Sequence, residues 1–239
     1  SGADLGVIVD PDVDRLALIC EDGKPFGEEY TLVSVADYLL SRVYNEALNT
    51  GRSIEEVAAP YQLVTSSNLS SSRALRDVTE QYGGEYFAAA VGEVNVTTKM
   101  REVGALIGGE GNGGVIYPAS HYGRDALVGI ALFLSSLAQK GCKVSELRAT
   151  FPEYCISKNR IDLTPEIDVD KVLEAVKEKY AGERINDKDG VKIDFADGWV
   201  HLRKSNTEPI IRVYSEAATM EEADALAKKV IDVVWAVVG

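Results

Sequence analysis

Two rhythms of apolar and polar positions alternate along the first 140 residues of the chain. Short apolar runs predict strands at residues 5–9, 16–20, 57–64, 85–91, 105–107 and 115–117. Stretches whose apolar residues recur at helical spacing predict helices at residues 31–48, 70–82 and 124–140. Strands that alternate with helices are typical of an α/β layer structure.

Beyond Pro152 the rhythm changes and predicts a second, smaller domain. A strand is expected at 154–163, a helix at 168–180, and a hairpin whose two strands meet at the turn Asp197–Gly198. A further strand leads to a long amphipathic helix, whose start is marked by a capping box of Thr219 and Glu222. The predicted order is β-α-β-β-β-α, which is an α+β arrangement.

The charge balance excludes some classes of partner. Among 239 residues, 25 Lys and Arg stand against 38 Asp and Glu, and the net charge is −13. Phosphate backbones require dense basic surfaces, so nucleic acid is not an expected partner. No apolar run approaches the length of a membrane span, and no leader pattern opens the sequence. We therefore expect a soluble, cytoplasmic protein without a membrane partner. The 3 cysteines stand apart, and we interpret them as buried thiols.

An acidic turn joins the first two predicted strands. Asp10, Asp12 and Asp14 alternate along it, and Arg15 follows. Carboxylate oxygens at this density suit a hard cation such as Mg²⁺ or Ca²⁺, because the negative charges would otherwise repel one another. The turn is therefore predicted to bind a metal ion.

Three other interpretations of the acidic turn stay open. An EF-hand would need a glycine where Arg15 stands and helices on both sides. The segment also resembles the nucleophile strand of haloacid-dehalogenase-type phosphatases, in which Asp10 would attack phosphorus and Asp12 would act as the acid. The third interpretation is a solvated acidic turn without a ligand.

A glycine-rich loop, residues 108–114, lies between two predicted strands. Its spacing satisfies the dinucleotide-binding pattern, but a strand follows instead of a helix, and Glu110 would repel a pyrophosphate. Glycines allow a close approach of the backbone to a ligand, while Glu110 and Asn112 present a carboxylate and an amide to neutral hydroxyls. This chemistry fits a sugar. The alternative is a tight strand connection with a solvated Glu110.

A cationic, hydroxyl-rich loop occupies residues 203–209 of the second domain. A guanidinium, two hydroxyls, an amide and exposed backbone N–H groups together form a phosphate cradle. The predicted phosphate-binding residues are Arg203, Ser205, Asn206, Thr207 and Arg212. The alternative is an ordinary polar turn.

These three loops, in this order, resemble those of the α-D-phosphohexomutase superfamily, which includes phosphoglucomutases, phosphomannomutases and phosphoglucosamine mutases. The resemblance covers essentially the whole chain. It implies that Asp10, Asp12 and Asp14 hold Mg²⁺ and that Arg15 is a catalytic residue near the reacting phosphate. It further implies that Glu110 binds sugar hydroxyls beside Asn112, where many members have serine. The loop from Arg203 to Thr207 would bind the phosphate.

Two departures from the family pattern bear on function. The family's lysine ahead of a glycine, a candidate acid/base, is replaced in the segment Ala90-Val91-Gly92. The phosphoserine loop Thr-Ala-Ser-His-Asn should precede the metal loop, and it does not occur there. A similar Ala-Ser-His at residues 119–121 follows the sugar loop instead, and we interpret it as a loop that caps the next helix.

The resemblance thus implies the C-terminal half of a phosphohexomutase. Residues 1–28 would be the end of domain 2 with the metal loop, 29–150 domain 3 with sugar recognition, and 151–239 domain 4 with phosphate binding. The expected fold is α/β: a mixed-sheet α/β domain, preceded by the end of another α/β domain, followed by the small α+β domain.

The implied reaction interconverts hexose 1-phosphate and 6-phosphate of glucose, mannose or glucosamine, through a phosphoserine enzyme and a bisphosphosugar. The implied partners are a hexose phosphate and the N-terminal domains of the same polypeptide, without which the chain is expected to be inactive. A Mg²⁺-dependent haloacid-dehalogenase-like phosphatase and a non-catalytic sugar-phosphate binding module are the alternatives.

Overall fold

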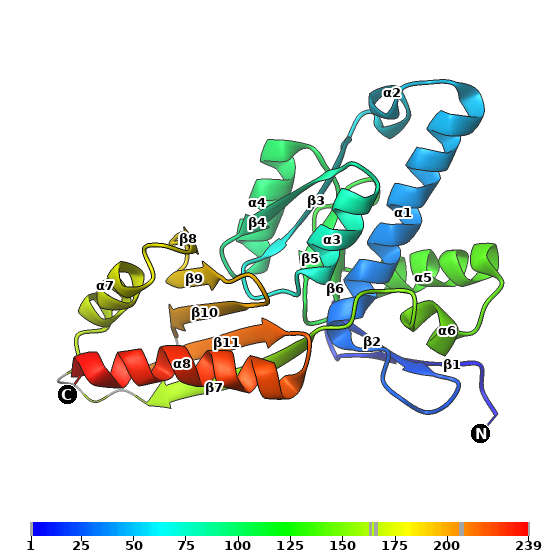
Figure 1. The fold of residues 1–239 in the computed structure, drawn as a ribbon. Helices are drawn as coiled ribbons and strands as arrows, with labels where there is room; N and C mark the ends of the chain where they lie inside the picture. The colour runs from blue at the N-terminus through cyan, green and yellow to red at the C-terminus, as the bar shows by residue number, and fades with distance from the viewer. Residues whose placement is uncertain (1, 163, 165–166, 206–207, 239) are drawn as a thin grey trace. The chain divides into compact units, whose positions relative to one another are not determined.

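The computed structural model describes residues 2–162, 164, 167–205 and 208–238. The chain divides into two compact units, Ser1–Pro152 and Glu153–Gly239, and each is described by itself. Figure 1 shows the first unit in blue to green and the second in yellow-green to red. The predicted α/β class is confirmed, whereas the predicted boundaries at residues 28 and 150 stay a prediction.

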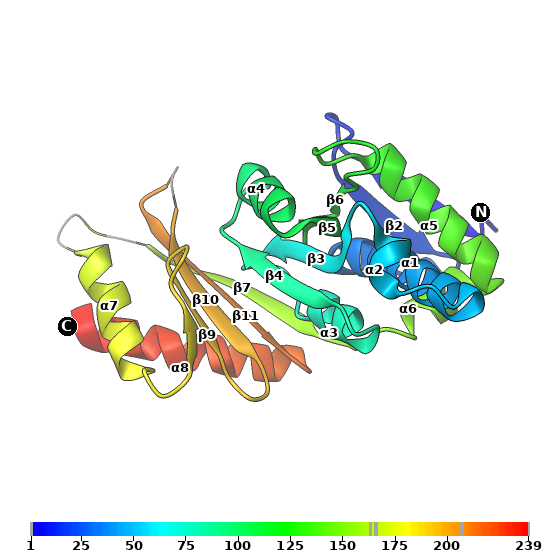
Figure 2. The same cartoon turned by 90° about the horizontal axis from the view of Figure 1, so that it is seen from above.

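A mixed sheet forms the centre of the first unit. Its elements, in chain order, are β1 (Leu5–Val9), β2 (Leu16–Cys20), α1 (Glu28–Thr50), α2 (Ile54–Ala58), β3 (Gln62–Asn68), α3 (Ala74–Gln81), β4 (Glu85–Ala89), α4 (Glu93–Val103), β5 (Ala105–Glu110), β6 (Gly114–Ile116), α5 (Ala126–Lys140) and α6 (Val144–Arg148). The sheet has the order β4-β3-β5-β6, with β4, β3 and β5 parallel and β6 antiparallel. Strands β1 and β2 form a separate antiparallel pair. Figure 2 shows α4 on one face of the larger sheet and α1 with α3 on the other.

One predicted strand is wrong at its start. Val57, inside the predicted strand 57–64, belongs to the short helix α2, and the strand β3 runs from Gln62 to Asn68 instead. Helix α2 begins with a capping box, in which Ser53 accepts a hydrogen bond from the N–H of Glu56 and donates its own N–H to the Glu56 carboxylate. The capping box therefore fixes a helix where apolar content alone predicts a strand.

Helix α4 was not predicted. It buries Val96 and Met100 against a cluster that includes Val64 and Ile116, so it covers one face of the sheet. Gly104 ends it in the left-handed conformation, with φ of 63°, and donates its N–H to Met100.

The second unit is an antiparallel sheet packed against two helices. Its elements are β7 (Cys155–Asp162), α7 (Val169–Lys179), β8 (Arg184–Asn186), β9 (Val191–Asp194), β10 (Trp199–Lys204), β11 (Ile210–Ala217) and α8 (Met220–Val238). The sheet order is β7-β11-β10-β9-β8. The predicted order of elements is confirmed, with β8 as an additional short strand. The capping box is also confirmed, since Thr219 and Glu222 exchange hydrogen bonds of 3.1 and 3.2 Å.

Both helices of the second unit bury their apolar faces in one core. Val176 of α7 and Val230 of α8 meet Val200 and Val213 of the sheet there.

None of the helices in the part of the chain that the structure describes is long and apolar enough to cross a membrane. The 3 cysteines are free thiols, of which Cys20 is buried as expected, whereas Cys142 and Cys155 are only half-buried.

A buried histidine makes the second unit sensitive to acid. His201 on β10 is 1% exposed, and its Nε2 donates a hydrogen bond of 2.6 Å to the carbonyl oxygen of Asp189. Burial lowers the pKa of His201 from its ordinary value of 6.5 to about 4. The unfolded chain therefore binds a proton more readily than the folded chain between these pH values, and stability falls as pH falls through this window.

We expect this histidine to remove about 2 kcal/mol of unfolding free energy between pH 7 and pH 5. The measurement is urea unfolding followed by tryptophan fluorescence, because both tryptophans, Trp199 and Trp235, lie in the second unit. A His201→Gln variant should lose less stability over the same pH range. An equal loss in the wild type and the variant would contradict this role of His201.

Candidate functional site

The acidic turn is held in place by its own hydrogen bonds. The Asp10 carboxylate accepts the N–H groups of Asp14 and Arg15, both at 3.2 Å, and the Nε of Arg15 at 2.7 Å. Partial burial acts to raise the pKa of Asp10, but the hydrogen bonds from Arg15 and Asp14 outweigh it and lower that pKa to about 2. Val13 adopts a positive φ of 55°, which is rare for a β-branched residue, and its carbonyl accepts the N–H of Ala126. The turn is thus fixed to the start of α5.

The three predicted metal ligands follow one another on this turn, and the carboxylates of Asp10 and Asp14 both lie beside arginine side chains. Asp10 faces Arg15, and the Oδ2 of Asp14 lies 2.5 Å from Nη2 of Arg124. Within residues 2–162, 164, 167–205 and 208–238, no group of three or more His, Cys, Asp or Glu side chains is gathered closely enough to hold a metal ion. The Oδ1 of Asp14 is buried and has no hydrogen-bond partner among those residues. The metal assignment of Asp10, Asp12 and Asp14 stays a prediction.

The glycine-rich loop is a short hairpin connection. Strand β5 ends at Glu110 and β6 begins at Gly114, so only residues 111–113 lie between them. The N–H of Gly111 donates to Ser71 Oγ at 3.0 Å, and Asn112 Oδ1 accepts the N–H of Gly114 at 3.2 Å. These two hydrogen bonds hold the backbone of Gly111 and Gly114 in place on either side of Asn112.

The structure brings the acidic turn and the glycine-rich loop together. The carbonyl oxygen of Gly113 accepts the N–H of Leu16, the first residue of β2, at 3.0 Å. A pocket of about 280 Å³ is lined by residues from both segments, including Asp10, Arg15 and Asn112. Two loops that stand about a hundred residues apart in the sequence thus form one site.

Glu110 is buried at this site, and both oxygens of its carboxylate accept hydrogen bonds. Its side chain is only 5% exposed. Oε1 accepts the amide of Asn68 at 2.8 Å and the N–H of Gly92 at 3.3 Å, and Oε2 accepts Nη1 of Arg124 at 2.7 Å. A buried carboxylate needs such partners, because an isolated charge would be costly away from water. The orientation of Glu110 is therefore set by three segments of the unit.

Arg124 is the residue that sequence reasoning missed. Its guanidinium contacts Asp14 at 2.5 Å, Glu110 at 2.7 Å and Glu93 at 3.5 Å, and its backbone N–H donates to Glu93 at 2.9 Å. It immediately precedes Asp125, the N-cap of α5. One planar guanidinium thus connects the acidic turn, the glycine-rich loop and the start of α4. The acidic turn and the glycine-rich loop together carry more carboxylates than cations in the sequence. This imbalance is the signal that could have indicated a further cation between them.

The predicted phosphate loop lies between β10 and β11 of the second unit. Arg203 and Arg212 stand directly opposite each other on these strands. Ser205 is buried, its N–H donates to Ile210, and its hydroxyl accepts the N–H of Glu208 at 3.3 Å. Asn206 and Thr207 lie outside the described residues. The structure therefore brings Arg203, Ser205 and Arg212 together.

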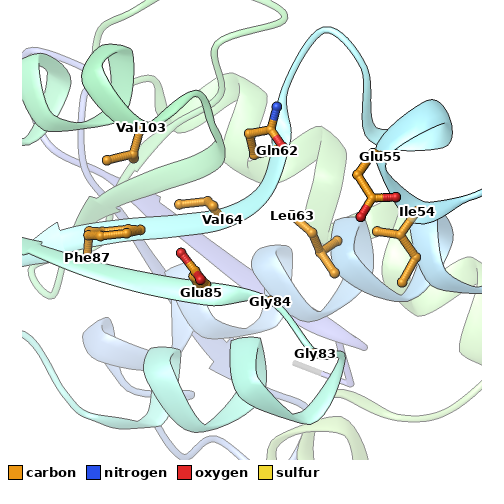
Figure 3. Close-up of a pocket in the computed structure, with 10 residues that line it drawn as sticks. All are labelled: Ile54, Glu55, Gln62, Leu63, Val64, Gly83, Gly84, Glu85, Phe87 and Val103. Atoms are coloured by element: carbon orange, nitrogen blue, oxygen red, sulfur yellow. The ribbon is translucent and has the colours of Figure 1, made fainter.

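A second pocket of the first unit lies away from these residues. It has a volume of about 480 Å³ and is shown in Figure 3. Gln62 and Glu85, the first residues of β3 and β4, lie on its wall, whereas Asn68 and Glu110 stand at the last residues of β3 and β5. Ligand sites of open α/β sheets lie at the carboxyl ends of strands. The candidate site therefore lies at the carboxyl ends of the strands, and the larger pocket lies at the opposite end.

Comparison with known proteins defines the class of protein to which these two units belong. Residues 30–154 match the family model "Phosphoglucomutase/phosphomannomutase, alpha/beta/alpha domain III", and residues 160–233 match "Phosphoglucomutase/phosphomannomutase, C-terminal domain". The chain belongs to the phosphoglucomutase/phosphomannomutase family. The resemblance that its three loops indicate is confirmed.

Curated relatives carry related names. A probable phosphoglucosamine mutase of Methanopyrus kandleri is 33% identical over 97% of this chain and 48% of its own length. A phosphoglucomutase/phosphomannomutase of Thermococcus kodakarensis is 37% identical over 93% of this chain and 45% of its own length. The chain spans about half the length of the curated relatives it matches.

Solved structures share the fold. A phosphoglucomutase/phosphomannomutase family protein from Burkholderia thailandensis has a TM-score of 0.78 at 22% identity, over 99% of this chain and 47% of that one. An Aspergillus fumigatus N-acetylphosphoglucosamine mutase, solved in complex with GlcNAc-6P and magnesium, has a TM-score of 0.66 at 16% identity, over 95% of this chain and 51% of that one.

Proposed function

We propose that this chain supplies the metal-, sugar- and phosphate-binding parts of a phosphohexomutase. The reaction would interconvert the 1-phosphate and 6-phosphate of glucose, mannose or glucosamine through a phosphoserine enzyme and a bisphosphosugar. The observation that carries the proposal is the joint site of the first unit, where Arg124 links Asp14 of the acidic turn to Glu110 of the glycine-rich loop. Family membership of both units supports it.

Mg²⁺ fits the donors of the acidic turn. Asp10, Asp12 and Asp14 supply only carboxylate oxygens, and the buried Oδ1 of Asp14 makes no hydrogen bond to the described residues. When bound there, the ion would neutralise negative charge on a phosphoryl group in transfer. The Aspergillus fumigatus mutase was solved with magnesium, which supports Mg²⁺ as the kind of ion.

Each remaining residue would act on one part of the substrate. Arg15, whose side chain is about half exposed beside Asp10, would donate hydrogen bonds to the reacting phosphate. Glu110 would accept hydrogen bonds from sugar hydroxyls, with Asn112 beside it. The loop of Arg203, Ser205, Asn206 and Thr207, together with Arg212, would anchor the phosphate that does not react.

The phosphoryl donor would come from outside these 239 residues. No Thr-Ala-Ser-His-Asn occurs in them, so no serine matches the family's phosphoserine loop. The partners of the chain would be a hexose phosphate and the phosphoserine-bearing domains of the same polypeptide. Glu110 can orient the sugar and Arg203 can hold a phosphate, but neither can supply a phosphoryl group.

The alternative interpretations of the acidic turn are not favoured. An EF-hand needs flanking helices, whereas β1 and β2 flank this turn. A phosphatase of the haloacid-dehalogenase type is not favoured, because both units match models of the phosphoglucomutase/phosphomannomutase family. Mg²⁺-dependent phosphate release that is lost in an Asp10→Asn variant would restore the phosphatase interpretation.

We expect the chain alone to bind glucose 6-phosphate without converting glucose 1-phosphate into it. In calorimetry, Arg203→Ala should weaken binding about 10- to 100-fold, because it removes charge-assisted hydrogen bonds worth about 1.5–3 kcal/mol. Arg184→Ala, an exposed arginine on β8 of the same unit, is the matched control and should leave affinity unchanged. Measurable turnover by the chain alone, or equal affinities of the two variants, would contradict the proposal.

A further inference from the structure

Three arginines form a row across the sheet of the second unit. Arg203 on β10 pairs with Arg212 on β11, and Arg212 pairs with Arg160 on β7. Residues directly opposite each other on antiparallel strands project to the same face, and like charges in such pairs repel. The row therefore concentrates positive charge on one face, in a chain whose net charge is −13.

A pocket lies on the β7 side of this row. Its volume is about 420 Å³, and its wall is formed by Lys158, Asn159, Arg160, Glu208, Ile210, Arg212 and Tyr214. Lys158 stands opposite Tyr214, two residue pairs along from the arginine row and therefore on the same face. Among the described residues of this wall, Lys158, Arg160 and Arg212 stand with one carboxylate, that of Glu208. Lys158 and Arg160 are not among the predicted phosphate-binding residues.

The carboxylates that contact the row balance it only in part. Nε of Arg160 lies 3.5 Å from Asp162, but the two side chains are 64% and 77% exposed, so water screens this contact. Arg212 pairs with Glu208 at 2.9 Å. Nε of Arg203 is buried and makes no hydrogen bond to any residue in the described part of the chain. An anion that accepts hydrogen bonds from the row would relieve its repulsion.

We propose that Lys158 and Arg160 are phosphate-binding residues, and that the pocket between β7 and β11 holds the phosphate group of a phosphorylated sugar. Arg160 and Arg212 would contact the phosphate from neighbouring strands, because guanidinium groups match its oxygens in a fork geometry. Lys158 would add a third cation, and the Tyr214 hydroxyl would reach a hydroxyl of the ligand. This inference rests on the proposed function through Arg212, and it extends the phosphate site beyond the loop of residues 203–207.

The pocket has a direct test in anion binding by the full chain. Calorimetry would measure the dissociation constants of inorganic phosphate and of glucose 6-phosphate at low and moderate salt. Arg160→Gln should weaken both about 10-fold, and Lys158→Gln about 3-fold, with a reduced salt dependence in each case. Arg184→Gln, on β8 at the opposite edge of the same sheet, should stay within about 2-fold of the wild type. Tryptophan fluorescence would verify that each variant is folded.

The outcomes separate this inference from the proposed function. Wild-type affinity in Arg160→Gln overturns the inference, as does the absence of phosphate binding by the wild-type chain at millimolar concentration. If Arg203→Ala weakens the binding of glucose 6-phosphate but Arg160→Gln and Lys158→Gln do not, the proposed function stands and the wider pocket is wrong. A third outcome is that Arg160→Gln weakens the binding of both ligands equally, while the wild-type chain binds glucose 6-phosphate no more tightly than inorganic phosphate. The pocket would then stand as an anion site, and the proposed recognition of the sugar would be wrong.

Discussion

Replacement of Arg124 by glutamine is expected to lower the unfolding free energy of the first unit by about 3–5 kcal/mol. The guanidinium is the cation that faces both Asp14 and Glu110, and the Glu110 side chain is 5% exposed. Without Arg124, the Glu110 carboxylate would keep the hydrogen bonds from Asn68 and Gly92 but lose its cation at a position that little water reaches. Glutamine keeps a donor but has neither the charge nor the fork that reaches two carboxylates.

Urea unfolding followed by circular dichroism would measure this effect, with tryptophan fluorescence reporting the second unit separately. Arg52→Gln is the control, because Arg52 contacts Glu46 at 3.4 Å with both side chains about half exposed. Such a surface pair contributes about 0–1 kcal/mol. A loss below about 1 kcal/mol in Arg124→Gln would mean that Arg124 does not carry the site.

Replacement of Gly113 by alanine should cost about 3–4 kcal/mol and disrupt the joint site. Gly113 has a positive φ of 87°, and a Cβ there would lie 2.3 Å from the carbonyl oxygen of Leu16. The added methyl group would therefore meet backbone of β2, which cannot move aside as the end of a flexible side chain can. The hydrogen bond from Leu16 to Gly113 would be lost with it.

Gly141→Ala provides the matched control for Gly113→Ala. Gly141 has a similar φ of 61°, and no atom lies within 4 Å of its added Cβ. Its replacement should cost only the left-handed backbone term, about 1–2 kcal/mol. The difference in unfolding free energy between the two variants measures the close approach of the two loops. Equal losses would show that the backbone of β2 does not restrict residue 113.

Sequence patterns predicted elements best where strong local signals bound them. Strands β1 and β2 have the predicted limits, because an acidic turn separates two short apolar runs. Helix α8 starts at its predicted capping box. In both cases the determining interactions lie within a few residues of the segment.

Helix α4 shows what local patterns cannot predict. Its sequence includes Val94, Val96 and Thr97, whose branched side chains lower helix propensity. Its N-cap, Gly92, makes no side-chain cap hydrogen bond. The helix is stabilised by packing of Val96 and Met100 against the sheet, which is a tertiary contact.

The same distinction applies to the candidate site. The acidic turn, the glycine-rich loop and the cationic loop were recognisable because each concentrates its chemistry in a short segment. Arg124 carries no such local pattern, since its contacts at Asp14, Glu93 and Glu110 come from three distant segments. The partner of a buried charge becomes apparent only when the fold brings those segments together.

The tight connection between β5 and β6 also restricts how this protein can diversify. Gly111 is hydrogen-bonded to Ser71, Gly113 to Leu16, and the side chain of Asn112 to the N–H of Gly114. An insertion would break at least one of these hydrogen bonds and displace Glu110. We therefore expect the length of the connection to be fixed. Under the proposed function, a change in hexose preference at this loop would have to arise through the side chain at position 112, and it would sacrifice the hydrogen bond from Gly114 to Asn112.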